Sequence, residues 1–260
     1  MAPLSFSSLT PRESISERST PLPLREVLKI LFESVGEGLW LVGGTALAGY
    51  YAEHRRSDDL DLFAVDEIAH RSGILAVKSL AKQGAILTGE RTTPNFYHAD
   101  VKFKGHAFTI DVVLDENLHR IGNANRRGDG VLVADLPTLL ATKAACLVSR
   151  CSEKDLFDLD WILSQARHYT ASDLVEAGNK IDGGVSIESF LIGLQGAILR
   201  KEACHFLLPD SNMSVEQAYH KIIALRTKLI ELLLKAEQKV APSDEIQALA
   251  QAVKDQKKIK

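Results

Sequence analysis

Hydrophobic positions in the first half of the chain follow two different periods. Apolar residues recur every three or four positions in 25–35 and in 66–83, the spacing of a helix with one buried face. A further helix is expected at 45–52, with Thr45 as its N-terminal cap. Gly105-His106 lies between two strand-like runs and predicts a tight hairpin. Short apolar or alternating runs predict strands at 39–42, 58–63, 85–91, 98–104, 107–114 and 131–134.

The second half of the chain shows helical spacing almost throughout. Asp135 is a capping residue with Pro137 in the first turn, and Ser152 begins the next helix. Ser214-x-x-Gln217 has the pattern of a capping box and starts the longest helix. Helices are expected at 137–150, 152–166, 172–181, 186–200, 214–240 and 243–256. The apolar stripe of the longest helix consists of Ile222, Leu225, Leu229, Leu232, Leu233 and Ala236.

These patterns divide the chain into three parts. Residues 1–24 contain four prolines and many serines, which predicts an irregular N-terminal arm. Residues 25–135 are expected to form an α/β domain and residues 136–260 a helical domain. The fold class is therefore α/β (α+β), with a mixed sheet and flanking helices followed by a C-terminal helical bundle.

Composition narrows the class of protein further. The chain has 260 residues, of which 45% are hydrophobic and 25% are charged, which is ordinary for a soluble globular protein. A net charge of −3 gives no bulk attraction to nucleic acid, although it leaves room for a local basic patch. The three cysteines form no framework of disulfides or zinc ligands. With no secretory signal and no apolar run near the roughly 20 residues of a membrane span, we expect a cytoplasmic protein without a membrane partner.

Two carboxylates stand out in the strand-like segment 58–63. Asp59 and Asp61 are two residues apart, so on a strand they face the same side with Cα atoms roughly 6.6 Å apart. Neighbouring carboxylates repel each other unless solvent or a cation separates them, and Mg²⁺ (or Mn²⁺) is a natural bridging ion because it prefers oxygen ligands. The alternative is that both acids belong to the solvated face of an edge strand.

A third acid, Asp111, lies in the apolar strand 109–113. An acid between Ile110 and Val112 requires an explanation, because aspartate is seldom buried without a partner. If this strand neighbours that of Asp59 and Asp61, the three acids can hold two metal ions that activate a hydroxyl and neutralise a leaving pyrophosphate. A simple salt bridge is the alternative.

Glycines precede the acids. Gly43-Gly44 allows backbone N–H groups to approach phosphate oxygens closely, and the helix that begins there favours anions at its N-terminus. A plain turn is the alternative reading of the glycine pair. Arg55 and Arg56 either bind phosphate or are solvated, and Arg56 is the better candidate of the two.

Two longer strings resemble a known family. LVGGTALAGYYAEHRRSDDLDLF and ATKAACLVSRCSEKDLFDLDWIL are similar to the two characteristic regions of AbiEii/AbiGii-type toxins. These toxins are the enzyme half of type IV toxin–antitoxin pairs and belong to the nucleotidyltransferase-fold superfamily. The resemblance covers about residues 27–165. It implies a metal-dependent enzyme that moves a nucleotidyl group from an NTP to an acceptor hydroxyl on RNA (tRNA) or protein, with a cognate antitoxin as partner.

The resemblance also implies roles for individual residues. Asp59 and Asp61 would hold the metal, with Asp111 as third acid and general base on the acceptor hydroxyl. Asp155 or Asp158 would orient the site, although Asp155 is equally the acid of a capping box begun by Ser152. The triphosphate would be held by Gly43, Gly44, Thr45, Ser57 and Lys143.

Two other functions remain open at this stage. One is a non-catalytic module of the same fold that binds an NTP or a protein partner. The other is a small-molecule nucleotidyltransferase of the kind that modifies antibiotics.

Overall fold

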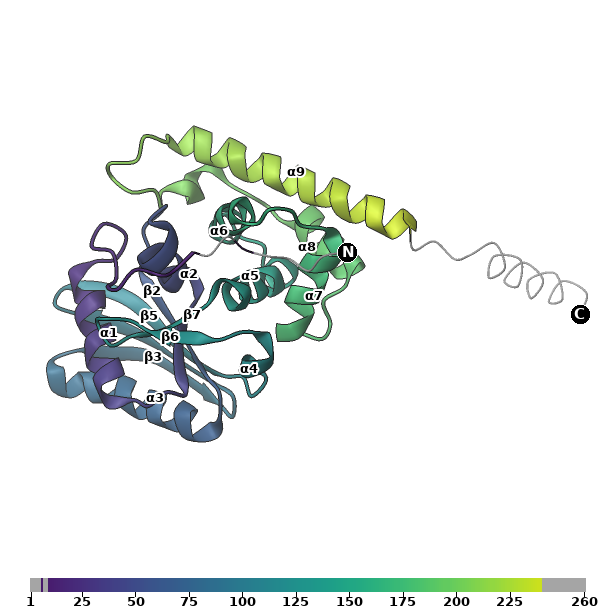
Figure 1. Cartoon of the computed structure of the whole chain (residues 1–260). Coiled ribbons are helices and arrows are strands. Elements are labelled where there is room, and N and C mark those ends of the chain that lie inside the picture. The colour runs from purple at the N-terminus through teal and green to yellow at the C-terminus, as the bar shows by residue number, and fades with distance from the viewer. Residues whose placement is uncertain (1–5, 7–8, 240–260) are drawn as a thin grey trace, which may run out of the picture.

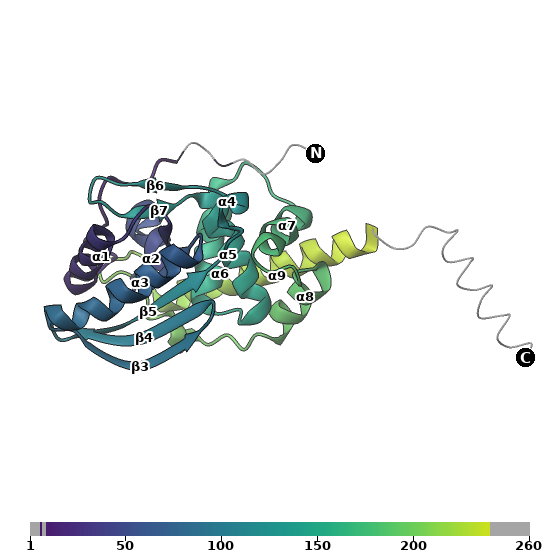
Figure 2. The same ribbon diagram turned by 90° about the horizontal axis from the view of Figure 1, so that it is seen from below.

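A mixed β-sheet forms the centre of the N-terminal half of the molecule (Figures 1 and 2). The computed structural model describes residue 6 and residues 9–239, so the helix expected at 243–256 lies outside the described residues. Across the sheet the strand order is β3-β4-β5-β2-β1-β7-β6. The strands are β1 (Leu39–Val42), β2 (Asp59–Ala64), β3 (Ile86–Thr93), β4 (Phe96–Phe103), β5 (His106–Leu114), β6 (Ala124–Arg126) and β7 (Leu132–Ala134).

The centre of the sheet determines where the acids lie. β2 pairs in antiparallel fashion with β1 and in parallel with β5. The register of the parallel pair sets Asp61 opposite Asp111 and Asp59 opposite Thr109. Alternation along β2 turns Leu60 and Leu62 into the core and leaves the two acids on the other face. The strand of Asp111 is therefore the direct neighbour of the strand of Asp59 and Asp61, which is the condition under which the three acids can act together.

The hairpin between β4 and β5 is confirmed with a small shift. Phe103 pairs with His106, so the two turn residues are Lys104 and Gly105 instead of Gly105-His106. Both have positive φ angles, 48° and 82°, as a two-residue hairpin turn requires. The short strand β6 had no signal in the sequence, because it is three residues long, polar and at the edge of the sheet.

Two helices cover the core face of the sheet. α1 (Leu22–Ser34) packs on α3 (Glu67–Ser79), and α3 lies against β1, β2 and β5. A short 3₁₀ turn, η2 (Leu80–Gln83), follows α3. α1 begins three residues before the expected start, because Pro23 occupies its first turn, where a missing N–H costs nothing.

The helix expected at 45–52 begins earlier and has a different start. α2 (Gly43–Ala46) follows β1 directly and continues as the wider π-type turn η1 (Leu47–Ala52). The expectation that Thr45 caps this helix is wrong. Thr45 lies inside the helix and is fully buried, and its hydroxyl contacts the Asp59 carbonyl and, at 2.9 Å, Ser57 Oγ. Thr45 therefore ties the glycine turn to the start of β2.

The C-terminal half is helical, as expected. The capping residues Asp135, Ser152 and Ser214 are confirmed, since each accepts the expected backbone N–H. α9 lies across α6 and α8, in yellow-green in Figure 1. The helices are α4 (Leu118–Ile121), α5 (Leu136–Ser149), α6 (Glu153–Gln165), α7 (Ala171–Ile181), α8 (Ile187–Gly196), the 3₁₀ turn η3 (Lys201–Cys204) and α9 (Val215–Lys239). In the described part of the chain, no helix has the length and apolar character needed to cross a membrane.

α8 ends at Gly196, four residues before the expected end at 200, because the backbone becomes extended at Ala197. Its close contact with α5 depends on Gly193, because a Cβ there would lie 2.3 Å from the Leu147 carbonyl oxygen. That oxygen belongs to the backbone and cannot move without moving α5.

We expect Gly193→Ala to lower the free energy of unfolding by about 1–3 kcal/mol, because the added methyl group separates α8 from α5. Urea denaturation measures the change. Gly196→Ala is the matched control, since a Cβ there meets nothing within 4 Å. Equal midpoints for the two variants would contradict the packing argument.

Candidate active site

One polar cavity of about 290 Å³ lies where the acid face of the sheet meets the helical half. Four acidic side chains and four basic side chains line it, together with hydroxyl groups and one glycine. The lining residues are Gly44, Arg55, Ser57, Asp59, Asp61, Thr109, Asp111, Lys143, Arg150, Ser152, Lys154 and Asp155. Acids from the strands therefore face cations that come mostly from the helices.

Asp59 and Asp61 differ in how the protein holds them. Asp59 is half-exposed and accepts a hydrogen bond of 3.0 Å from Thr109 Oγ1, across the β2–β5 pair. Among the described residues, no hydrogen bond or ion pair involves the carboxylate of Asp61. It lies against Gly43, where a Cβ would come within 1.9 Å of Asp61 Oδ2 and where φ is +66°. Two separate constraints therefore require glycine at position 43: the positive φ angle and the carboxylate that leaves no space for a Cβ.

The environment of Asp61 disfavours its negative charge. Burial raises the pKa of its carboxyl group to about 6, and the neighbouring carboxylates of Asp111 and Asp59 contribute, while Lys143 opposes the shift. A partly buried acid with a raised pKa among other acids, in a cavity, is typical of a functional site.

The carboxylate of Asp111 forms a hydrogen bond with a histidine on the neighbouring strand. His98 lies opposite Asp111 in the β4–β5 register, and its Nδ1 is 2.6 Å from Asp111 Oδ1. Sequence analysis did not single out His98, because only the strand register brings it to the site.

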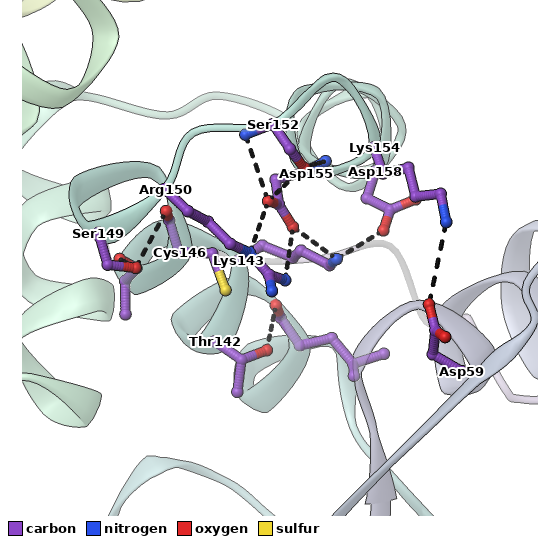
Figure 3. Close-up of polar contacts among 12 residues, drawn as sticks. Asp59, Thr142, Lys143, Cys146, Ser149, Arg150, Ser152, Lys154, Asp155 and Asp158 are labelled. Atoms are coloured by element: carbon purple, nitrogen blue, oxygen red, sulfur yellow. Dashed lines mark hydrogen bonds and ion pairs between the residues drawn. The ribbon is translucent and has the colours of Figure 1, made fainter. Parts of the chain in front are cut away.

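A network of buried charges forms the other side of the cavity (Figure 3). Asp158 on α6 accepts two hydrogen bonds from Arg55, at 2.6 and 2.7 Å, and lies 2.8 Å from His54 Nε2. Lys143 on α5 contacts Asp158 at 2.8 Å and Asp155 at 3.0 Å. Gly44 is part of this packing, because a Cβ there would lie 2.3 Å from Arg55 Nη2.

Mutual pairing keeps this network charged. Burial alone would raise the pKa of the Asp158 carboxyl, but Arg55 and Lys143 hold it well below its usual range. Burial likewise opposes the charge of Lys143, and Asp158 and Asp155 outweigh it and raise the pKa of the ammonium group. His54 differs, because burial lowers its pKa despite its hydrogen bond to Asp158. The imidazole is therefore neutral at pH 7.

Two further cations are more accessible. The side chains of Arg150 and Lys154 are 64% and 45% exposed. Arg150 contacts Asp155 at 3.1 Å. Lys154 belongs to α6, and its Nζ lies 3.9 Å from Oδ2 of Asp59 on β2. Asp155 also closes the capping box with Ser152, so it belongs both to the start of α6 and to the cavity wall.

The structure brings most of the expected site residues to one cavity. Gly43 does not line it but lies directly behind Asp61, while Thr45 and Asp158 are fully buried outside it. Lys143 lines the cavity with its ammonium group already bound by two carboxylates. The residues that do line the cavity as expected are Gly44, Ser57, Asp59, Asp61, Asp111, Lys143 and Asp155.

One expectation is wrong. Arg55, not Arg56, reaches the cavity, because Arg56 is exposed and Arg55 points inward to Asp158. Sequence analysis also placed neither Thr109 nor Ser152 in the site, although it identified Ser152 as a helix cap, and it noted Arg150 and Lys154 only as part of the matching string. A hydroxyl two residues before Asp111 was the available signal for Thr109.

The donor set is suited to a hard divalent cation. In the described residues no three acidic, histidine or cysteine side chains converge closely enough to form a ready-made metal group. Mg²⁺ does not need one, because it keeps several waters and binds through one or two carboxylates plus substrate phosphates. The partly buried carboxylate of Asp61, crowded by two other acids and without a hydrogen bond among the described residues, fits this requirement.

The mixed sheet, with acids on its central strands beside a glycine turn, is the architecture of a nucleotidyltransferase. The chain belongs to the nucleotidyl transferase AbiEii toxin family of type IV toxin–antitoxin systems, whose sequence profile matches residues 28–256. The mixed sheet with flanking helices expected from the sequence is thus confirmed as the fold of a nucleotidyltransferase toxin.

Two solved structures illustrate what the chain is similar to. MenT4, a nucleotidyltransferase toxin from Mycobacterium tuberculosis, superimposes with a TM-score of 0.50 at 16% identity, covering 85% of this chain and 83% of its own. JHP933 from Helicobacter pylori gives a TM-score of 0.48 at 18% identity, covering 84% of this chain and 93% of its own. Comparison with curated protein sequences found no match.

We expect Asp158→Ala to lower the free energy of unfolding by about 3–5 kcal/mol, because it leaves Arg55 and Lys143 buried without their shared partner. Urea denaturation at pH 7 checks this. The matched control on the same helix is Asp160→Ala, whose partner Lys221 at 2.7 Å is partly exposed, so the loss should stay below about 1 kcal/mol. Similar losses for both variants would contradict a buried, structural role for Asp158.

The raised pKa of Asp61 predicts a pH-dependent cost in stability. Between about pH 4 and pH 6 the folded protein keeps this proton while the unfolded chain has lost it, so stability falls as the pH rises through that window. Without added metal, Asp61→Asn should be more stable than wild type at pH 8, by on the order of 1–3 kcal/mol, and nearly equal to it at pH 4. Urea midpoints at the two pH values measure this. A variant less stable at pH 8 would refute the expectation.

Proposed function

We propose that this protein uses Mg²⁺ (or Mn²⁺) to transfer a nucleotidyl group from an NTP to a hydroxyl group on a macromolecule, as the toxin of a toxin–antitoxin pair. The observation that carries the proposal is the single cavity in which Asp59, Asp61 and Asp111 face a wall of cations. Membership of a type IV toxin–antitoxin family supports both the NTP substrate and a cognate antitoxin as partner.

The triphosphate is best accommodated between the glycine turn and the start of α6. Lys143 is buried and paired with Asp155 and Asp158, so the cations most accessible to phosphate are Arg150 and Lys154, of which Arg150 also contacts Asp155. Gly44 and Ser57 also line the cavity, and a backbone N–H and a hydroxyl group are hydrogen-bond donors for phosphate oxygens. Lys143 then serves mainly to hold Asp155 and Asp158 in place.

Charge balance supports a metal requirement. The cavity already contains as many acidic as basic side chains, so a triphosphate that entered alone would meet the three strand acids without a cation between them. A divalent cation held by Asp61 with Asp59 or Asp111 offsets that repulsion, and when bound it supplies Lewis-acid stabilisation of the phosphate charge. Binding at Asp61 also removes the cost of burying that carboxylate.

The chemical step needs little from the protein beyond position and charge. The acceptor oxygen attacks the α-phosphorus, the bond from that phosphorus to the bridging oxygen breaks, and pyrophosphate leaves. Asp111 takes the hydroxyl proton as general base, since its carboxylate lines the cavity from β5, whereas Arg150 and Lys154 come from the end of α5 and the start of α6. Arg150 and Lys154 stabilise the negative charge that develops on pyrophosphate.

The surroundings of Asp111 favour a large acceptor. On β4, the face that carries His98 continues through Asp100 to Lys102, and both of these side chains are exposed. Figure 2 shows β3 and β4 side by side at the rim of the sheet, away from α5–α9. An RNA or protein hydroxyl can reach Asp111 over this open surface without entering a closed pocket. This favours a macromolecule over an antibiotic-sized acceptor.

The direct test is transfer of label by the full-length protein with Mg²⁺. Each of the four NTPs, labelled at the α-phosphate, is incubated separately with total RNA, with a cell protein extract and with aminoglycosides. We expect label on RNA or protein, and a loss of at least about 100-fold in Asp61→Asn and in Asp59→Asn, because charge stabilisation at such sites has that magnitude.

Label on the γ-phosphate provides the control for reaction type. Nucleotidyl transfer releases this label as pyrophosphate, whereas a kinase would move it to the acceptor. Label transferred only from the γ-phosphate, or transfer unaffected by Asp61→Asn, would refute the proposal. Product found only with aminoglycosides would replace the macromolecular acceptor by a small molecule.

A further inference from the structure

We propose that His98 is a positioning residue that holds the carboxylate of Asp111 in the orientation needed for metal and acceptor. The inference rests on the proposed function, because it assigns His98 a task only if Asp111 has one. His98 lies outside the motifs of the sequence and reaches the site through the pairing of β4 with β5.

The contact between the two side chains is short and directed. Nδ1 of His98 lies 2.6 Å from Oδ1 of Asp111, and the two residues are directly opposite in an antiparallel pair. A carboxylate can only accept, so the Nδ1–H group of the imidazole is the donor. The hydrogen bond therefore places a proton on Nδ1 and orients the carboxylate.

The imidazole is itself held in place. His98 is only 8% exposed, its Nε2 lies 3.5 Å from Asp100 Oδ1, and its ring stacks on Phe96 with the centroids 6.4 Å apart. A side chain fixed on three sides transmits its position to its partner, which a freely rotating donor would not.

His98 acts through Asp111 and not directly on substrate. The cavity is lined by Asp111 but not by His98, which places the imidazole behind the carboxylate. Among the described residues, Asp111 Oδ2 has no hydrogen bond, so one oxygen is anchored and the other is left for the cavity. This division suits a carboxylate that must face a metal ion or a hydroxyl with one oxygen.

The same arrangement recurs for Asp59, whose Oδ1 is anchored by Thr109. Two of the three strand acids are thus oriented by hydrogen bonds from neighbouring strands, whereas Asp61 is confined by the Gly43 backbone. Partners of this kind around metal-ligating side chains typically change metal affinity or activity by about 10–100-fold when removed.

The test measures Mn²⁺ binding to the full-length protein by electron paramagnetic resonance, together with kcat and the KM for the NTP in the labelling assay. We expect His98→Ala to weaken Mn²⁺ binding and to lower kcat, each by about 10–100-fold, with a KM for the NTP within about threefold of wild type. The phosphate-binding wall is untouched, so the loss should fall on kcat.

Two amide substitutions separate positioning from simple packing. The side-chain nitrogen of asparagine can occupy the place of Nδ1, whereas that of glutamine extends toward the place of Nε2. His98→Asn should therefore restore Mn²⁺ binding to within a few-fold of wild type, and His98→Gln should behave like His98→Ala.

His70 offers a matched control. It is 4% exposed, and its Nε2 lies 3.2 Å from the carbonyl oxygen of Val112, the residue after Asp111, on the core face of the same strand. His70→Ala removes a buried imidazole of the same kind and should leave Mn²⁺ affinity unchanged, even if it lowers the thermal midpoint.

The outcomes distinguish the inference from the proposed function. If Asp61→Asn abolishes Mn²⁺ binding but His98→Ala binds like wild type, only the role of His98 is overturned. Equal weakening by His98→Ala and His98→Asn, or by His98→Ala and His70→Ala, also overturns it. If the wild-type protein neither binds Mn²⁺ nor transfers label, both proposals fall together.

Discussion

The carboxylate of Asp158 is the point on which the two halves of the molecule depend. It binds Arg55 and His54, which precede β2, and Lys143 on α5, while it belongs to α6 itself. Because all these groups are buried, each needs the others, and removal of one leaves a desolvated charge without a partner. The network holds the start of β2 at a set distance from the start of α6. Those are the two segments that carry the strand acids and the exposed cations.

On one side of the cavity between these segments the charged groups are paired, whereas the other side contains a carboxylate that has no partner among the described residues. Every charge around Asp158 has a partner, whereas Asp61 carries a raised pKa and no hydrogen bond among the described residues. Proteins tolerate such local costs mainly where a ligand relieves them. Under the proposed function, the stable side would orient the cations and the costly side would provide affinity for a metal-bound triphosphate. Stability and the proposed function would then be opposed at Asp61 and aligned at Asp158.

Sequence patterns predicted the elements well where their signal was local. The caps at Asp135, Ser152 and Ser214 were confirmed, because a capping side chain acts within three residues of its helix start. Thr45 was misread for a related reason: the strand before it runs directly into the helix, so its hydroxyl bonds to β2 instead. Arg55 and Arg56 could not be told apart by position alone. The buried carboxylate that selects Arg55 lies about a hundred residues away in the chain.

The sequence alone determined that Asp59 and Asp61 share one face of a strand, because alternation along a strand is a property of the backbone. It also determined the glycine turn before them and the helical character of residues 136–239. Only the tertiary structure decided that Asp111 lies opposite Asp61, that His98 lies behind Asp111, and that Lys143 forms ion pairs with Asp155 and Asp158. Strand order and register depend on how the whole sheet packs, and a buried charge pairs with a group that this packing brings near it.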